Sequence, residues 1–184
     1  MNIFAVDEDP ALAAFALPDK HIVKMPLETT QMIALVFSKW YWNVGPVLKL
    51  DGTPYKTEKG AFRNHPCTKW AAENADNLQW LFQHGISLCQ EYTDRFGKKH
   101  ACENSIRLAA LTQMENGCPE KHTPFVRAMP DTLKYDDTID TITAYRMYLS
   151  TKEWALDNYR VPDKKPSWLS LIHISEPTRQ EARS

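Results

Sequence analysis

Apolar side chains at helical spacing constrain the fold of this chain more than any other feature. The clearest apolar stripe follows residues 64–66 and consists of Trp70, Leu78, Leu81, Leu88 and Tyr92. Such spacing places the side chains on one face of an α-helix. Pro66 suits the first turn of this helix, and Asn64 or His65 suits its cap. Because Gly97 is a typical helix end, we predict one continuous helix of roughly eight turns.

A second apolar stripe follows Asp19, which can cap a helix. Its members are Ile22, Met25, Met32, Val36 and Trp40. Pro26 conflicts with an uninterrupted helix, because proline lacks the N–H that would bond to the preceding turn and it kinks the rod. The sequence therefore leaves open whether this helix begins at Asp19 or at Pro26.

The remaining segments predict shorter elements. Helices are expected over residues 11–17, over residues 100–114, and in a segment that Asp137 or Thr138 caps, where Ile142, Tyr145, Leu149 and Ala155 face inward. Residues 1–6 are apolar and predict a short strand or a buried N-terminal arm. Residues 43–64 contain several glycines and prolines and predict a loop, with a hairpin left open. The expected fold is mainly α, a single compact helical domain with a short N-terminal extended arm.

Composition limits the class of protein. The chain has 184 residues, of which 43% are hydrophobic, so it is long enough for one domain with a sizeable core. Its net charge of −1 excludes a global basic field, so any phosphate site must be local. No segment approaches the roughly 18 apolar residues of a membrane helix. We expect a soluble, unsecreted protein whose four cysteines are reduced thiols without disulfides.

The end of the chain differs in origin from the rest. Residues 169–179 read LSLIHISEPTR, which is a translation of a transposase adapter used in sequencing libraries. We therefore interpret residues 169–184 as a non-native, adapter-derived tail, residues 1–168 as the single domain, and the gene as metagenomic.

A polar stripe lies beside the apolar one on the helix after Asp19. It consists of His21, Lys24, Glu28 and Gln31, spaced three, four and three residues apart, with Lys20 beside it. A solvated face and a functional site are both open interpretations. If the apolar stripes of the two long helices pack together, their polar stripes meet at one shared edge.

The long helix after Pro66 carries its own polar line, in which Asn77, His84 and Glu91 recur at intervals of seven and Arg95 follows one turn later. Arg63, Asn64 and His65 lie at its start, where free N–H groups and the helix dipole favour an anion. Lys98, Lys99 and His100 add a local basic cluster. We expect His21, Lys24, Glu28, His65 and Arg95 to converge on one pocket.

Three histidine–cysteine pairs raise the question of a metal site, namely His65 with Cys67, His100 with Cys102, and Cys118 with His122. Structural zinc sites favour ligand pairs two to four residues apart in a repeated pattern, and these pairs do not form that pattern. We predict no metal. No glycine-rich phosphate loop is present, and no cofactor is expected.

Four motifs carry a resemblance to a known family: DKHIVKMPLETTQM (residues 19–32), NHPCTKW (64–70), EYTDRFGKKH (91–100) and TPF (123–125). Across nearly all of residues 1–168 the chain resembles an uncharacterised family of tailed-phage proteins. This resemblance implies a viral protein in the cytoplasm of an infected bacterial host.

A remote resemblance links the chain to phage pyrimidine-dimer DNA glycosylases. It rests on Asp19 and His21, an acid seven residues after that histidine, and a His-containing helix start. In that family a glutamate on the first helix works with an N-terminal amine that attacks the sugar, and Glu28 matches that glutamate. Those enzymes expose an N-terminal threonine, whereas the bulky Asn2 predicts that Met1 is retained here. Lys24, one turn before Glu28, is then the candidate amine, and the absence of the mechanism is also left open.

We conclude from the sequence that the chain binds a nucleotide or a flipped DNA nucleotide. The most specific form of this hypothesis is that it cleaves an N-glycosidic bond, as a glycosylase does. Glu28 and Lys24 are the catalytic candidates, Lys24 and Arg95 would hold phosphate, and Trp70 or Trp80 would stack on the base. The predicted ligand-binding residues are Lys20, His21, Gln31, Arg63, Asn64, His65, Trp70, Asn77, Tyr92, Arg95, Lys99 and His100. The alternatives are a non-catalytic, anti-defence protein that sequesters a host nucleotide immune signal, with a homo-oligomer left open, and a structural protein.

Overall fold

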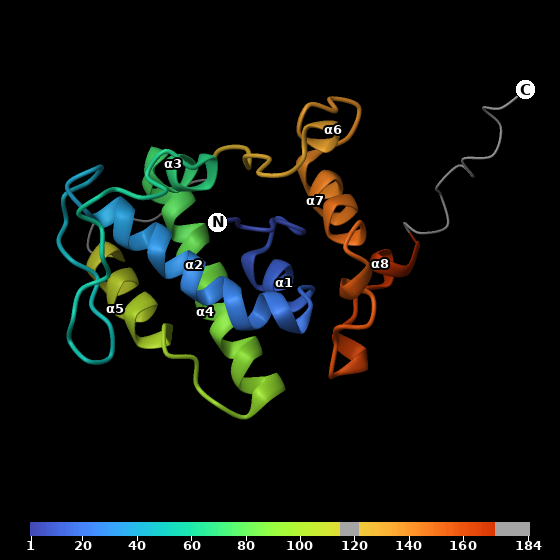
Figure 1. The fold of residues 1–184 in the computed structure, drawn as a ribbon, viewed down its shortest axis with the longest axis horizontal. Coiled ribbons are helices and arrows are strands. Elements are labelled where there is room, and N and C mark those ends of the chain that lie inside the picture. Colours follow the sequence, from blue (N-terminus) through green and yellow to red (C-terminus); the bar gives the residue numbers. More distant parts are fainter. Residues whose placement is uncertain (115–121, 172–184) are drawn as a thin grey trace, which may run out of the picture.

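Two long helices, α2 (Asp19–Phe37) and α4 (Ala75–Phe96), pack against each other at the centre of the molecule (Figure 1). The computed structural model describes residues 1–114 and 122–171, and within these ranges it contains helices and no strand. The shorter elements are α1 (Pro10–Phe15), α3 (Pro66–Glu73), α5 (Glu103–Met114), α6 (Asp131–Lys134), α7 (Thr141–Ser150), α8 (Ser167–Leu171) and the 3-10 turns η1 (Glu153–Ala155) and η2 (Pro162–Lys164). The predicted mainly α domain with an extended N-terminal arm is confirmed.

Helix α2 runs through Pro26 without interruption, so it begins at Asp19 and not at Pro26. Buried side chains on both sides of the proline, Ile22 and Met32 among them, hold the two halves against the core. The helix stops at Phe37, where the Ser38 hydroxyl donates to the carbonyl oxygen of Leu35 (2.7 Å). Trp40 therefore lies beyond the helix, contrary to the predicted apolar stripe.

The predicted long helix after Pro66 is two helices, and the single-helix prediction is wrong. Asn74 is extended (φ −158°, ψ 172°), and its side-chain oxygen accepts from the backbone N–H of Asn77. An asparagine side chain that satisfies a free N–H in this way starts a new helix, which here becomes α4. The predicted start and end are confirmed, because His65 caps α3 and Gly97 ends α4 with φ 67°.

The apolar N-terminus forms a buried arm (residues 1–6) with no strand pairing, so of the two alternatives the arm is correct. In the loop between α2 and α3, a single antiparallel bridge pairs Leu48 with Pro54. Of the hairpin that the sequence left undecided, only this bridge is present. The last predicted helix is α7, but Asp140, and not Asp137 or Thr138, caps it. Ala155 is buried in η1, beyond that helix.

Arg95 is a buried link between several elements. Its guanidinium donates to the carbonyl oxygens of Phe15, at the end of α1, and Leu17, just beyond it. It also forms ion pairs with Glu91 (2.9 Å) and Asp19 (3.2 Å). From the C-terminal segment, Lys164 Nζ lies 2.9 Å from the other Glu91 oxygen. This network joins the ends of α1, α2 and α4 to the last part of the described chain.

The expected domain boundary after Trp168 remains a prediction, and residues 172–184 lie outside the described residues. Leu169, the first residue of the predicted tail, is fully buried in the core. Cys67, Cys89 and Cys102 are free thiols, while Cys118 lies outside the described residues. Among the described helices, none is both long and apolar enough to span a membrane.

We predict that Arg95→Met destabilises the protein by about 3–5 kcal/mol, because it removes the buried donor to the Phe15 and Leu17 carbonyls and leaves Glu91 with Lys164 as its remaining charged partner. The matched control is Arg107→Met, which breaks the exposed Arg107–Glu103 pair at the same four-residue spacing and should cost at most about 1 kcal/mol. Urea unfolding of both variants measures the difference. Equal losses in the two variants would contradict a structural role for Arg95.

Candidate functional site

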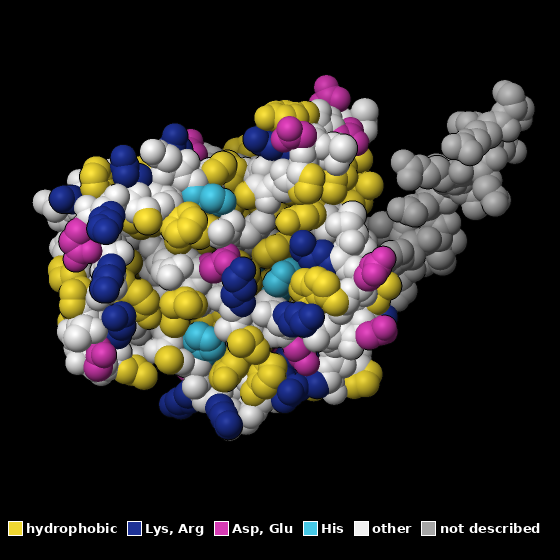
Figure 2. Space-filling model, viewed as in Figure 1, with side chains coloured by type: hydrophobic (Ala, Val, Ile, Leu, Met, Phe, Trp, Pro, Cys, Tyr) yellow, Lys and Arg dark blue, Asp and Glu magenta, His cyan; other side chains and the backbone are white. Residues whose placement is uncertain are grey.

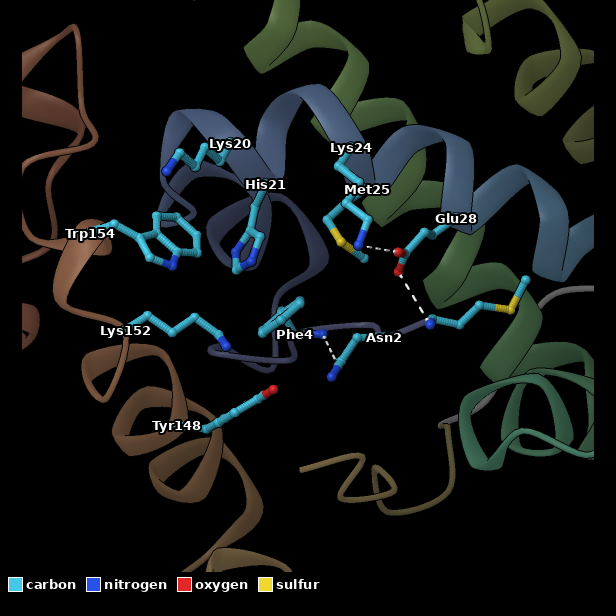
Figure 3. Close-up of a pocket in the computed structure, with 11 residues that line it drawn as sticks. Asn2, Phe4, Lys20, His21, Lys24, Met25, Glu28, Tyr148, Lys152 and Trp154 are labelled. Carbon is cyan, nitrogen blue, oxygen red and sulfur yellow. Dashed lines mark hydrogen bonds and ion pairs between the residues drawn. The ribbon is translucent and has the colours of Figure 1, made fainter. Parts of the chain in front are cut away.

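A pocket of about 470 Å³ lies where the N-terminal arm, α2 and the segment around α7 and η1 meet (Figure 3). We call it the amine pocket. The arm contributes Met1, Asn2 and Phe4; α2 contributes Lys20, His21, Lys24, Met25 and Glu28; and the C-terminal part contributes Tyr148, Lys152 and Trp154. Its wall therefore combines three segments that are distant in sequence.

Glu28 lies between two amines. The Met1 α-amine is 3.7 Å from Glu28 Oε2, and Lys24 Nζ is 2.9 Å from Glu28 Oε1. The side chain of Lys24 is 68% exposed, whereas the side chains of Glu28 and Met1 are 12% and 4% exposed. The Met1 side chain is thus packed away while its α-amine reaches the carboxylate, and Lys24 approaches from the solvent side on a mostly exposed side chain.

The arm that carries this amine is held by side chains. Asn2 Oδ1 accepts from the backbone N–H groups of Ile3 and Phe4, and Asn2 Nδ2 donates to the carbonyl oxygen of Ala128 (2.7 Å). Phe4 has φ 40°, a conformation that non-glycine residues rarely adopt and that often marks functional sites. Further along, Arg146 of α7 donates to the carbonyl oxygen of Val6 (2.8 Å). These contacts fix the direction in which the chain leaves the pocket.

Aromatic rings form one side of the amine pocket. Phe4 lies 4.1 Å from the His21 ring and is nearly parallel to Tyr148 at 5.9 Å, while Trp154 meets His21 edge-on at 5.3 Å. Two lysines lie over these rings, Lys20 over Trp154 and Lys152 over Tyr148, at 4.7 and 4.3 Å from the ring centroids. Rings of this kind stack on nucleobases, and ammonium groups bind phosphate.

His21 is a neutral polar group within this charged wall. Burial lowers the pKa of its imidazole to about 3, and the positive charges of Lys152 and Lys24 act in the same direction. Its buried Nδ1 has no hydrogen-bond partner among the described residues. Around the pocket, Figure 2 shows Lys and Arg side chains over α2 and along the edge formed by the loop between α2 and α3. The balanced net charge therefore conceals a face with many basic groups.

Part of the predicted site is brought together. Lys20, His21, Lys24 and Glu28 all line the amine pocket, and Gln31 lines a neighbouring pocket that shares Met1. His65 lies close enough to the Met1 amine and the Glu28 carboxylate for both charges to affect its pKa. Burial is the main cause that lowers this pKa, the Met1 amine lowers it further, and the Glu28 carboxylate acts in the opposite direction.

The structure does not bring the other predicted residues to this pocket. The guanidinium of Arg95 is fully enclosed and bonds to protein oxygens. Trp70 is buried against Trp80 and Phe125, and Asn77 donates to the carbonyl oxygen of Trp70. The remaining candidates lie elsewhere: Arg63 over the Trp40 ring, Asn64 in a separate shallow hollow, Tyr92 against Phe96, Lys99 at an exposed position and His100 bonded to the carbonyl of Val23.

The repeated His-x-Cys spacing has a structural explanation. The Nδ1 atoms of His65 and His100 accept from the backbone N–H groups of Cys67 and Cys102, each at 3.2 Å. Both histidines satisfy free N–H groups where a helix begins. The absence of a metal stays a prediction.

Sequence reasoning missed the Met1 amine and the C-terminal part of the wall. The missed signal for the first is that Met1, if retained as predicted, carries an α-amine of its own. No local signal points to Tyr148, Lys152 or Trp154, since their role depends on the packing of α7 and η1 beside the arm.

Comparison with known proteins bears on the first part of the chain. A family model described as pyrimidine dimer DNA glycosylase matches residues 1–104. This match includes Met1, Glu28 and His65, and it excludes the aromatic wall from α7 and η1. No curated protein and no solved structure matches the chain.

We predict that the protein loses stability as the pH falls from about 6.5, because His21 and the fully buried His84 have pKa values of about 3 and about 4 in the fold. The unfolded chain binds these protons near pH 6.5, whereas the folded chain binds them only near pH 4 and pH 3. Lowering the pH from about 6.5 towards these values therefore favours unfolding. The measurement is urea unfolding at pH 7 and pH 5, with NMR titration of the histidine rings. Replacing His84 with Gln should reduce the difference between the two pH values, and a full imidazolium signal from His21 at pH 5 would contradict this interpretation.

Proposed function

The chain belongs to the pyrimidine dimer DNA glycosylase family, and we propose on that basis that it cleaves the N-glycosidic bond of a DNA nucleotide held in the amine pocket. The observation that carries the proposal is the Met1 α-amine beside the Glu28 carboxylate in an aromatic, lysine-lined pocket. A nucleotide must leave the base stack to reach such a pocket, as enzymes that act on bases require.

The Met1 α-amine is the proposed nucleophile. Its nitrogen lone pair attacks C1′ of the deoxyribose, and the bond between C1′ and the base breaks with its electron pair going to the base, which takes up a proton. The attacking nitrogen then loses one proton, and the C1′–O4′ bond breaks with its electron pair going to O4′. The second N–H proton passes to O4′, which leaves a hydroxyl on the open sugar and an imine between Met1 and C1′. No oxidant or metal enters this sequence.

Two considerations favour Met1 over Lys24 as the nucleophile. The α-amine is held near Glu28 by an anchored arm in which the Met1 side chain is only 4% exposed, whereas the Lys24 side chain extends into solvent. In general, α-amines titrate near pH 8 and lysine ammonium groups at about 10.4, so an α-amine more often has a free lone pair at neutral pH. Lys24 then acts as the countercharge that orients the Glu28 carboxylate and as a contact for phosphate.

Glu28 is the proposed stabiliser of positive charge at C1′. As the base departs, the sugar becomes cationic, and a carboxylate fixed beside it lowers the energy of that state. The same carboxylate positions the attacking amine at 3.7 Å from its Oε2 atom. Its low exposure strengthens both effects, because little water screens the charge.

The rest of the pocket is proposed to hold the nucleotide. Phe4, Tyr148 and Trp154 offer ring faces to the base, and Lys20 and Lys152 offer charge to its phosphates. A non-catalytic protein that sequesters a nucleotide would use the same contacts but leave its ligand intact, so turnover decides between them.

We predict that sodium borohydride traps the protein on DNA that contains an abasic site, because borohydride reduces an imine to a stable amine. Peptide mapping should place the adduct on Met1. The control Lys24→Gln should still form the adduct, and one extra alanine before Met1 should weaken trapping, since it moves the amine by up to about 3.8 Å. An adduct on Lys24, or no adduct at all, would contradict the proposed nucleophile.

Glu28→Gln tests the second catalytic group. It preserves the shape of the side chain and removes the charge, so base release from damaged DNA should fall by a factor of at least about 100 with little change in melting temperature. The matched control is Glu103→Gln, which removes a carboxylate from an equivalent four-residue ion pair outside the pocket. Normal base release by Glu28→Gln, or a change in binding alone, would contradict a catalytic role.

A further inference from the structure

We propose that the bound DNA strand continues past Met1 into a second pocket, which holds the nucleotide next to the reacting one. This inference rests on the proposed function and assigns a second binding pocket for the DNA that the function requires. The second pocket, which we call the loop pocket, has a volume of about 310 Å³ and lies between α2 and the loop of residues 38–64. It adjoins the amine pocket because Met1 lines both.

The polar stripe of α2 connects the two pockets. Lys20, Lys24 and Glu28 line the amine pocket, and Gln31 lines the loop pocket. From Lys20 to Gln31 the helix rises by about 16 Å, at 1.5 Å per residue. A stacked DNA strand carries one phosphate for about every 3.4 Å of axis, so this line is longer than a single nucleotide needs. The length of the stripe therefore favours a chain of nucleotides.

The walls of the loop pocket suit a nucleotide. Lys49 and Lys56 are exposed at its rim, and Tyr55 and Phe62 supply aromatic rings. Lys49 lies 5.9 Å from the centroid of the Tyr55 ring, and Lys56 has no ion-pair partner among the described residues. Over residues 38–64 five basic side chains face two acidic ones, and Figure 2 shows basic groups along this edge. Charge and rings together match a phosphate and a base.

Phe62 is the most informative residue of this pocket. Its ring is 59% exposed, and its backbone has φ 65°, which costs a phenylalanine free energy that glycine or asparagine would avoid. The loop on either side is firmly held, because Trp40 Nε1 donates to the Thr57 carbonyl (2.7 Å) and the His65 N–H donates to the Phe62 carbonyl (3.0 Å). A strained, exposed ring on a fixed loop beside the reacting centre is placed to stack on a neighbouring base.

The test measures binding without chemistry. The probes are a fluorescein-labelled single strand that contains a tetrahydrofuran abasic analogue, which has no base to release, and deoxyadenosine monophosphate. The wild-type protein should bind the strand at least tenfold more tightly than the mononucleotide. Phe62→Asn, which keeps a residue that tolerates the backbone conformation, should weaken strand binding about tenfold and leave mononucleotide binding unchanged.

Matched controls are available among residues that line neither pocket. Tyr135 is an exposed ring after α6, and Tyr135→Asn should bind the strand as tightly as the wild type. Lys56→Gln should make the salt dependence shallower by about 0.7 in the slope of log K against log salt concentration, as expected for one lost contact to a single strand. Lys134→Gln on α6 should leave that slope unchanged.

The outcomes separate this inference from the proposed chemistry. The loop pocket is overturned if the wild-type protein does not bind the strand, or binds it no more tightly than the mononucleotide. It is also overturned if Phe62→Asn keeps normal strand affinity and Lys56→Gln keeps the wild-type salt slope. Loss of strand affinity in these variants without any borohydride adduct on Met1 supports the loop pocket and contradicts the proposed nucleophile. An adduct on Met1 with normal strand binding by both variants supports the proposed nucleophile and contradicts the loop pocket.

Discussion

The burial of the N-terminal arm against α2 is the constraint on which the site depends. An extended segment without a strand partner must satisfy its backbone groups in other ways, and here the side chains of Asn2 and Arg146 do so. The apolar side chains of Ile3, Ala5 and Val6 provide the burial that keeps the arm in place. Without the arm, Glu28 would face only the solvated ammonium of Lys24, and the pocket would lose one of its three walls.

The parts of the fold that depend on local chemistry were predictable from the sequence. Gly97 ends a helix because it adopts a left-handed conformation easily, and His65 caps a helix because Pro66 follows it. The questions that the sequence left open or answered wrongly concern competition between local preference and packing. Pro26 disfavours a helix locally, yet burial on both sides keeps α2 continuous. Asn74, in contrast, divides into two helices an apolar stripe that looks continuous in the sequence.

The site was predictable to the extent that it lies on one helix. The stripe from Lys20 to Gln31 follows from helical spacing alone, and the structure places all of its members at two adjoining pockets. The guanidinium of Arg95 is a group that commonly binds phosphate, but here it bonds to residues of α1, α2 and the segment that follows α1. No spacing rule relates these segments, so the sequence could not show that Arg95 is already occupied. The histidines of the His-x-Cys pairs likewise look like metal ligands until their Nδ1 atoms are seen to bond to the backbone.

The bond from Arg146 to the carbonyl of Val6 has a mechanical consequence. Arg146 lies in α7, two residues before Tyr148, and Val6 ends the arm that begins with the amine. A displacement of Tyr148 would therefore reach the segment that carries the amine through about half a turn of helix and one hydrogen bond. The aromatic wall and the arm that begins with the Met1 amine are thus attached to the same helix, and a substitution that shifts α7 would alter both together.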